Sequence, residues 1–141
     1  MISFEFIDVE VPELSSELFS FWLCDVAREE SKLPGEITLI FCSDEHLLEM
    51  NQQYLDHDYY TDIITFDYSV GAEISGDLFV SIDRVYDNAS ENAVTREVEL
   101  RRVCVHGVLH LCGYGDKSDN ESIVMRSKED YYLDKYVSRE T

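Results

Sequence analysis

The segment REVELRRVCVHGVLHLCG (96–113) constrains this chain more than any other stretch, because it reads as one long helix that ends at a glycine. It carries His106 and His110, and residues four apart lie on one face of a helix, about one turn from each other. The two imidazoles can therefore reach one point, as in H-x-x-x-H zinc sites. The pair alone is equally compatible with two half-buried histidines that bind no metal.

The residues after this helix favour a metal site. Gly113 allows a sharp turn, and Asp116 follows six residues after His110. The spacing is similar to the zincin pattern H-E-x-x-H-x-x-G-x-x-H, in which a glycine turn returns a third ligand to the metal. Two positions differ from that pattern. Gly107 replaces the glutamate that acts as the general base in peptidases, and Asp116 replaces the third histidine.

The remaining periodicity predicts an α+β fold with about four strands and four or five helices. Strands are expected at 1–9, 36–43, 61–68 and 76–83, and helices at 13–30, 44–55, 84–92, 96–112 and 119–137. Ser43 and Thr95 are expected N-caps, Ser118 and Glu121 form an expected capping box, and Pro34-Gly35 is an expected turn. Strands 61–68 and 76–83 can pair as a hairpin. The order of strands in the sheet does not follow from these patterns.

Length and composition favour one domain over residues 1–141 in the cytoplasm. Apolar residues make up 45% of 141 residues, which is ordinary for a globular protein. We find no apolar run near the roughly 18 residues that span a bilayer, and no basic residue precedes the apolar N-terminal stretch. The four cysteines form no C-x-x-C pair, so buried, reduced thiols are expected.

The charge of the chain limits its partners. Thirty acidic residues against eleven basic ones give a net charge of −19. No lysine or arginine occurs between Lys32 and Arg84. Because phosphate binding depends on basic side chains, a DNA-binding role is not expected. The lack of a spanning apolar run likewise argues against a membrane partner. An RNA-binding role requires a local basic patch, bound metal ions or a protein partner.

Three segments together resemble a known family. HGVLHLCGYGD (106–116) is similar to the signature H-G-x-L-H-L-x-G-Y-D-H of the YbeY family, bacterial endoribonucleases of ribosomal RNA maturation. MNQQYLDHDYYTDIITFDY (50–68) resembles the family segment N-x-x-Y/F-R…T-D-V-L-S-F, and GDLFVSID (76–83) resembles G-D-I-x-I-S. The segments occur in family order over the family's length. The resemblance implies a mostly parallel sheet with a zincin-like metal helix packed against it.

The resemblance also implies the metal ligands. The first two signature histidines are His106 and His110, and the third ligand position falls on Asp116 when the alignment has no gap. An alignment with one insertion would place Lys117 there instead, but a lysine must lose its proton before it can bind a metal. We therefore predict one Zn²⁺ per chain, with Mn²⁺ or Fe²⁺ as alternatives because the aspartate is a harder ligand. Asp116 also leaves the site less positive than three histidines would, which raises the pKa of a bound water.

Other positions bear on substrate binding. The family arginine after N-x-x-Y/F corresponds to Leu55, which offers no fork for a phosphate. Arg102 or Arg101 is the alternative phosphate contact, unless both belong to a solvated helix face. Asp62 is a candidate carboxylate behind the metal ligands, or a turn residue at the start of a strand. His46 lies outside the signature, as does His57, which we expect to be exposed.

Three functions remain open at this point. The first is a single-strand-specific endoribonuclease that acts in small-subunit ribosomal RNA processing and ribosome quality control with a metal-activated water. The second is a non-catalytic ribosome-assembly factor with a structural metal, bound to the small ribosomal subunit or to a basic ribosomal protein. The third is a metallopeptidase, against which Gly107 argues. The cleavage site and the oligomeric state do not follow from the sequence.

Overall fold

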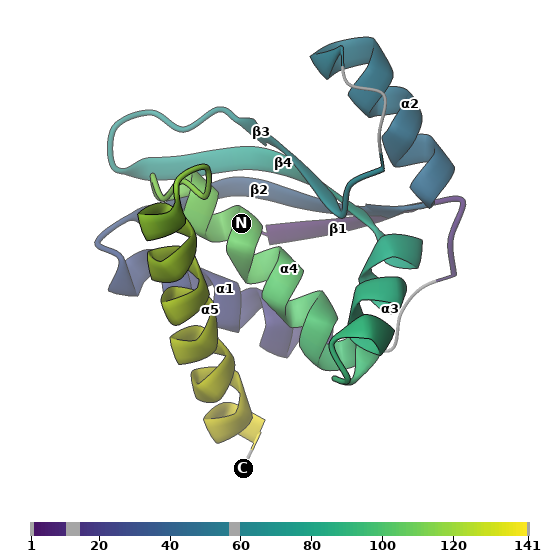
Figure 1. The fold of residues 1–141 in the computed structure, drawn as a ribbon. Coiled ribbons are helices and arrows are strands. Elements are labelled where there is room, and N and C mark those ends of the chain that lie inside the picture. Colours follow the sequence, from purple (N-terminus) through teal and green to yellow (C-terminus); the bar gives the residue numbers. More distant parts are fainter. Residues whose placement is uncertain (1, 11–14, 57–59, 141) are drawn as a thin grey trace.

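The computed structural model describes residues 2–10, 15–56 and 60–140, and in these ranges it contains four strands and five helices (Figure 1). The chain order is β1 (Ile2–Ile7), α1 (Ser16–Glu29), β2 (Leu33–Cys42), α2 (Asp44–Leu55), β3 (Ile63–Asp67), β4 (Glu73–Ser81), α3 (Ile82–Glu91), α4 (Arg96–Leu111) and α5 (Asp119–Glu140). This confirms the expected α+β class. No helix in the described ranges is long and apolar enough to cross a membrane.

The strands form one sheet in the order β1-β2-β4-β3. β1 and β4 both pair in parallel with β2, and β3 pairs antiparallel with β4. The expectations of a mostly parallel sheet and of a hairpin between β3 and β4 are therefore confirmed. β1 and β3 are the two edge strands of this sheet.

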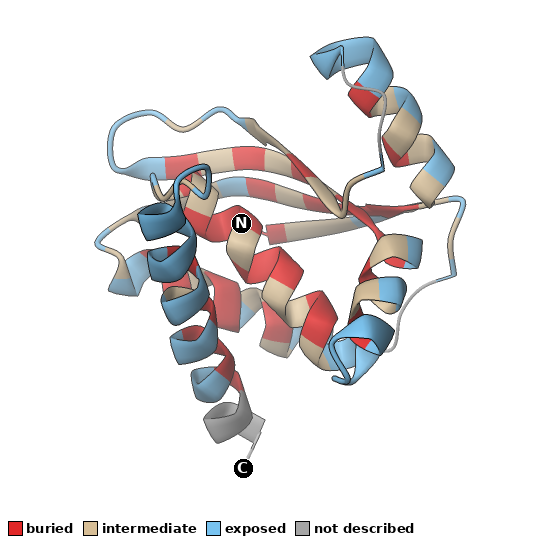
Figure 2. Ribbon diagram, viewed as in Figure 1, coloured by how far each residue is buried: buried red, intermediate tan, exposed pale blue. Residues whose placement is uncertain are grey.

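Helices cover both faces of the sheet. α1, α3, α4 and α5 lie on one side and α2 lies on the other (Figure 1). Alternate residues of β4 follow this division, since Leu78 and Val80 belong to the main core while Phe79 packs on a smaller cluster. That smaller cluster includes Leu47 of α2 and Ile64 of β3. Figure 2 shows that α5 buries its inner side and exposes its outer side.

The predicted helix caps are confirmed. The hydroxyl oxygens of Ser43 and Thr95 accept hydrogen bonds from His46 N and Val98 N. At the start of α5, Ser118 Oγ accepts from Glu121 N at 3.1 Å, while Glu121 Oε1 accepts from Ser118 N at 3.1 Å. This is the reciprocal capping box.

Several predicted boundaries are wrong. Pro34 and Gly35 do not form a turn, because β2 already begins at Leu33 and Pro34 pairs with Ile74 of β4. A register shift between Pro34 and Ile37 marks a bulge, where a proline without an N–H is tolerated. β4 ends at Ser81 rather than at 83, because the Ser81 side chain caps α3.

The expectations for the cysteines and for the start of the first helix are only partly met. All four cysteines are free, as expected, although only Cys42 and Cys104 are fully buried and Cys24 and Cys112 are half-buried. The predicted start of the first helix at 13 lies outside the described residues, and α1 begins at Ser16 after the N-cap Ser15.

Candidate metal centre

The turn after α4 positions the third member of the site. Gly113 has φ 108°, which favours glycine, and its N–H donates to His110 O at 3.0 Å. Tyr114 N donates to Leu109 O at 3.1 Å. These two bonds are those of a Schellman motif, which ends the helix and reverses the chain. The reversal brings Asp116 back over the histidine face of α4.

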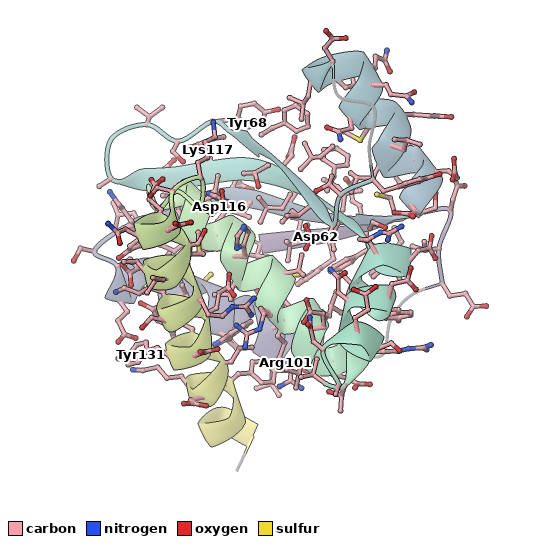
Figure 3. All side chains as sticks on the ribbon, in the orientation of Figure 1. Asp62, Tyr68, Arg101, Asp116, Lys117 and Tyr131 are labelled. Carbon is pink, nitrogen blue, oxygen red and sulfur yellow. The ribbon has the colours of Figure 1, made fainter. Side chains whose placement is uncertain are left out.

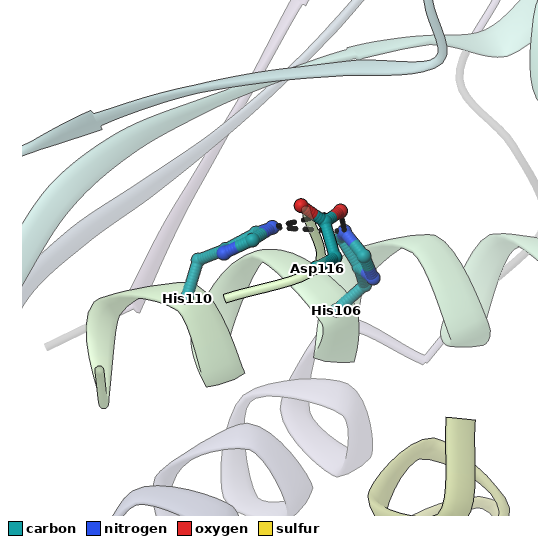
Figure 4. Close-up of side chains that lie close together, drawn as sticks. All are labelled: His106, His110 and Asp116. Carbon is teal, nitrogen blue, oxygen red and sulfur yellow. Dashed lines mark hydrogen bonds and ion pairs between the residues drawn. The ribbon is translucent and has the colours of Figure 1, made fainter. Parts of the chain in front are cut away.

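His106, His110 and Asp116 meet at one point (Figure 4). The two Nε2 atoms are 3.0 Å apart, and Asp116 Oδ2 lies 3.2 Å from His106 Nε2 and 3.4 Å from His110 Nε2. Three ligands of a tetrahedral zinc at about 2.0–2.1 Å are separated by about 3.3 Å. The donor atoms therefore stand at the spacing that a tetrahedral metal requires.

The outer nitrogens of both imidazoles fix their tautomers. His110 Nδ1 lies 2.7 Å from Tyr114 O, which can only accept, so Nδ1 carries the hydrogen. His106 Nδ1 lies 2.7 Å from Glu129 Oε2 and donates in the same way. Neutral imidazoles of this tautomer direct two Nε2 lone pairs at each other, an arrangement that a cation between them stabilises. The residues fit a divalent metal.

Glu129 joins the site to α5. It is 4% exposed, and its Oε1 accepts from Arg102 Nη1 at 2.9 Å. Burial alone would lower the pKa of His106, but the hydrogen bond and charge of Glu129, together with Asp116, outweigh burial and raise that pKa. Asp62 also contributes to this rise. The surroundings of His106 therefore favour positive charge.

Two cavities adjoin the cluster. The groove cavity, of about 550 Å³, runs along β3 from Asn51 and Leu55 of α2 to His106, His110, Asp116 and Lys117. The α4–α5 cavity, of about 290 Å³, lies between those two helices and also reaches His106 and Asp116. The metal cluster thus stands where the two cavities meet.

Asp62 lines both cavities and immediately precedes β3. Its backbone carbonyl accepts from Ser81 N at 2.9 Å, which fixes it against the end of β4. Burial raises the pKa of its carboxyl, and the charge of His106 opposes that rise. Figure 3 shows Asp62 beside the sheet and Asp116 at the approach to α5. A half-buried carboxyl with a raised pKa beside a metal cluster is typical of a functional position.

Gly107 faces the sheet and not the metal cluster. A Cβ at this position would lie 2.7 Å from Ile63 Cδ1 and 3.0 Å from Leu78 Cδ1. The glycine lets α4 pack closely on β3 and β4. A glutamate here would be directed into the core, so the peptidase base has no room at this position.

Cationic groups near the cluster are few. Among the residues that line the groove cavity, Lys117 is basic, and it is exposed. Arg102 has both ends of its guanidinium paired, with Glu129 and with Asp130 at 2.7 Å. Arg101 lies over the Tyr136 ring, 4.2 Å from its centroid. Figure 3 shows it in the N-terminal half of α4, away from Asp116.

Of the other two histidines, the structure describes His46, which is not part of the cluster. His46 lies in the first turn of α2, half-buried. His57 lies outside the described residues.

Sequence reasoning missed the two groups that accept hydrogen bonds from the metal-ligating histidines, Glu129 and the carbonyl of Tyr114. Glu129 occupies a position of the buried stripe of α5 that also contains Met125, Tyr132 and Tyr136. A carboxylate in an apolar stripe is a signal that could have indicated a buried partner. The carbonyl of Tyr114 offered no such signal, because its role depends on backbone geometry.

Comparisons with known proteins agree with the resemblance. A family model described as Endoribonuclease YbeY matches residues 2–137. A protein named Endoribonuclease YbeY from Flavobacterium psychrophilum is 55% identical over 134 residues, covering 94% of each chain. One of the same name from Phocaeicola vulgatus is 48% identical over 133 residues, covering 94% of this chain and 96% of its own. The solution structure of TM1509 from Thermotoga maritima is 28% identical, covers 96% of this chain and 90% of its own, and has a TM-score of 0.63.

Proposed function

The chain belongs to the YbeY endoribonuclease family, and on that premise we propose that it is a metal-dependent endoribonuclease that cleaves single-stranded RNA. The observation that carries the proposal is the cluster of His106, His110 and Asp116, whose donor atoms stand 3.0 to 3.4 Å apart. Ribosomal RNA in small-subunit maturation and quality control is the proposed substrate, and the small ribosomal subunit in the cytoplasm is the proposed partner. Residues 1–141 then act as one hydrolase domain.

Zinc is the proposed metal. Two imidazoles and one carboxylate with a fourth position open to a cavity match catalytic zinc sites. When bound, the metal supplies a Lewis acid that polarises a water molecule and a phosphate oxygen. Glu129 and the carbonyl of Tyr114 hold the two imidazoles in the tautomer that leaves Nε2 free.

We assign two further roles, accepting the proton and binding the RNA strand, to other residues of the chain. Asp62 is the proposed proton acceptor, because its raised pKa makes its carboxylate a stronger base near neutral pH. The groove cavity along β3 is the proposed path of the RNA strand, with Lys117 as a phosphate contact. Leu55 on the opposite side provides apolar surface in place of a cation. Arg102 braces Glu129 in this scheme and is not the phosphate contact.

Cleavage of a fluorescently labelled single-stranded RNA by metal-loaded protein tests this function. We expect His110→Ala to abolish cleavage and His46→Ala, which removes a histidine outside the cluster, to cleave like the wild type. Equal cleavage by His110→Ala would contradict the proposal. Intact RNA with the wild type, together with co-sedimentation with small ribosomal subunits, would support a non-catalytic assembly role instead.

A further inference from the structure

The α4–α5 cavity has a buried floor and an exposed rim. Its floor includes Glu99, Val103 and Met125, all at least nine-tenths buried. Its rim includes Ser122 and Arg126, which are exposed. About 290 Å³ is near the lower limit for small-molecule sites, so the cavity suits one small ring system rather than a length of polymer.

Glu99 is buried in this cavity without a partner. It is 5% exposed, and its carboxylate makes no hydrogen bond or ion pair with any residue in the described ranges. Burial raises the pKa of this carboxyl, with Arg102 acting in the opposite direction. Its oxygens are not fully enclosed, because they open to the cavity that Glu99 lines. A ligand in the cavity that donates hydrogen bonds can therefore reach a carboxylate that no described side chain occupies.

The cavity does not suit a second metal. Arg102 and Arg126 line it together with the acids, so its charges are mixed. Glu99 also precedes His106 by seven residues of α4, a rise of about 10.5 Å along the helix. Paired catalytic metals stand only about 3.5–4 Å apart. A ligand with both donors and acceptors matches these side chains better than a cation does.

An exposed cationic side chain stands at the rim. The side chain of Arg126 is 61% exposed, and its ion pair with Glu129 Oε1 is long, at 3.6 Å. It can therefore turn toward a ligand in the cavity. Val103 and Met125 supply apolar surface for the face of a flat ring. Apolar walls with a few convergent polar groups are typical of a pocket for an unstacked base.

We propose that the α4–α5 cavity binds a guanine base next to the phosphate that is cleaved, with Glu99 accepting from the base and Arg126 donating to it. Guanine presents N1–H and the N2 amine side by side, so a carboxylate can accept from both. Its O6 and N7 are acceptors for an arginine. Cytosine and adenine place a ring acceptor beside their amine, which would face the carboxylate, and uracil has no amine. This proposal rests on the proposed function and names its sequence preference.

Binding of four nucleoside 5′-monophosphates to metal-loaded protein tests the pocket. GMP, AMP, CMP and UMP share the phosphate and the ribose, so differences in affinity report the base. We expect GMP to bind about tenfold or more tightly than the others, because one bidentate pair gives discrimination of that order. Glu99→Gln should reduce the preference to about threefold or less. Glu97→Gln, in the same turn of α4 but exposed, should keep it.

The outcomes separate this inference from the proposed function. Equal binding of all four nucleotides to the wild type, or a preference that persists in Glu99→Gln, would overturn the pocket. Since Glu99 has no partner to lose, the glutamine variant should keep the wild-type unfolding temperature; Glu99→Asp, which shortens the side chain, replaces it if it does not fold. RNA cleavage without base preference would support the endoribonuclease function and contradict the guanine pocket. A Glu99-dependent preference for GMP without RNA cleavage would support the guanine pocket and contradict the endoribonuclease function.

Discussion

Replacing Glu129 by glutamine tests how the carboxylate behind His106 supports the metal site. Glu129 is buried, and it accepts from His106 Nδ1 at 2.7 Å and from Arg102 Nη1 at 2.9 Å. Hydrogen bonds that involve charged groups each contribute about 1.5–3 kcal/mol. Glutamine keeps the shape and one acceptor but removes the charge. We therefore expect the metal-free protein to lose about 1.5–3 kcal/mol of unfolding free energy.

The same change should weaken metal binding. Loss of a hydrogen-bonding group behind a metal ligand typically lowers affinity 10- to 100-fold, which is about 1.4–2.7 kcal/mol. Competition with a coloured chelator measures the affinity, and urea unfolding with and without metal measures the stability. The stabilisation by saturating metal should shrink by the same amount, because binding to the native state alone is linked to stability.

Asp130→Asn is the matched control. Asp130 is exposed and accepts from the other end of Arg102, without contacting His106. We expect this variant to bind metal like the wild type. Equal metal affinity in Glu129→Gln and the wild type would refute the reasoning, as would an equal loss in Asp130→Asn.

Three further changes have outcomes that follow from single contacts. Gly107→Ala should cost about 1–3 kcal/mol of unfolding free energy, because the new methyl would overlap Ile63; an unchanged urea midpoint would show that α4 has room to move. Glu30→Gln should flatten the acid limb of the stability–pH curve. Burial would raise the pKa of Glu30, but hydrogen bonds from Tyr114 and other donors outweigh burial and lower it. Its stabilisation is therefore present above the unfolded pKa of about 4.3 and is lost as the pH falls. Urea unfolding from pH 3 to 7 checks this, and a curve that matches the wild type would contradict it. Leu55→Arg should strengthen RNA binding and steepen its salt dependence by about 0.7 in log–log slope, whereas arginine at the exposed Leu33, outside the groove, should not.

The local part of the site was predictable from the sequence. The helical spacing of His106 and His110, the glycine that ends α4 and the return of Asp116 all depend on contacts within eleven residues. The caps Ser43 and Thr95 were predictable for the same reason. Periodicity identifies helices and strands through neighbours along the chain, and these features need nothing else.

The partners of the site residues and the order of the strands depend on contacts between segments that are distant in the sequence. His106 meets Glu129 from 23 residues away, and the Tyr114 hydroxyl donates to Glu30 from 84 residues away. No local pattern selects these partners. Strand order has the same limitation, so the mostly parallel sheet followed from the family resemblance and not from periodicity. The Pro34-Gly35 turn was wrong because a bulge within β2 accommodates both residues.

Metal content tests the central claim most directly. Mass spectrometry of tag-free protein would count metal per chain in the wild type, in Asp116→Ala and in Lys117→Ala. Ligation by His106, His110 and Asp116 predicts close to one metal per chain in the wild type and Lys117→Ala, with a sharp loss in Asp116→Ala. Full occupancy in Asp116→Ala, or a loss confined to Lys117→Ala, would contradict it.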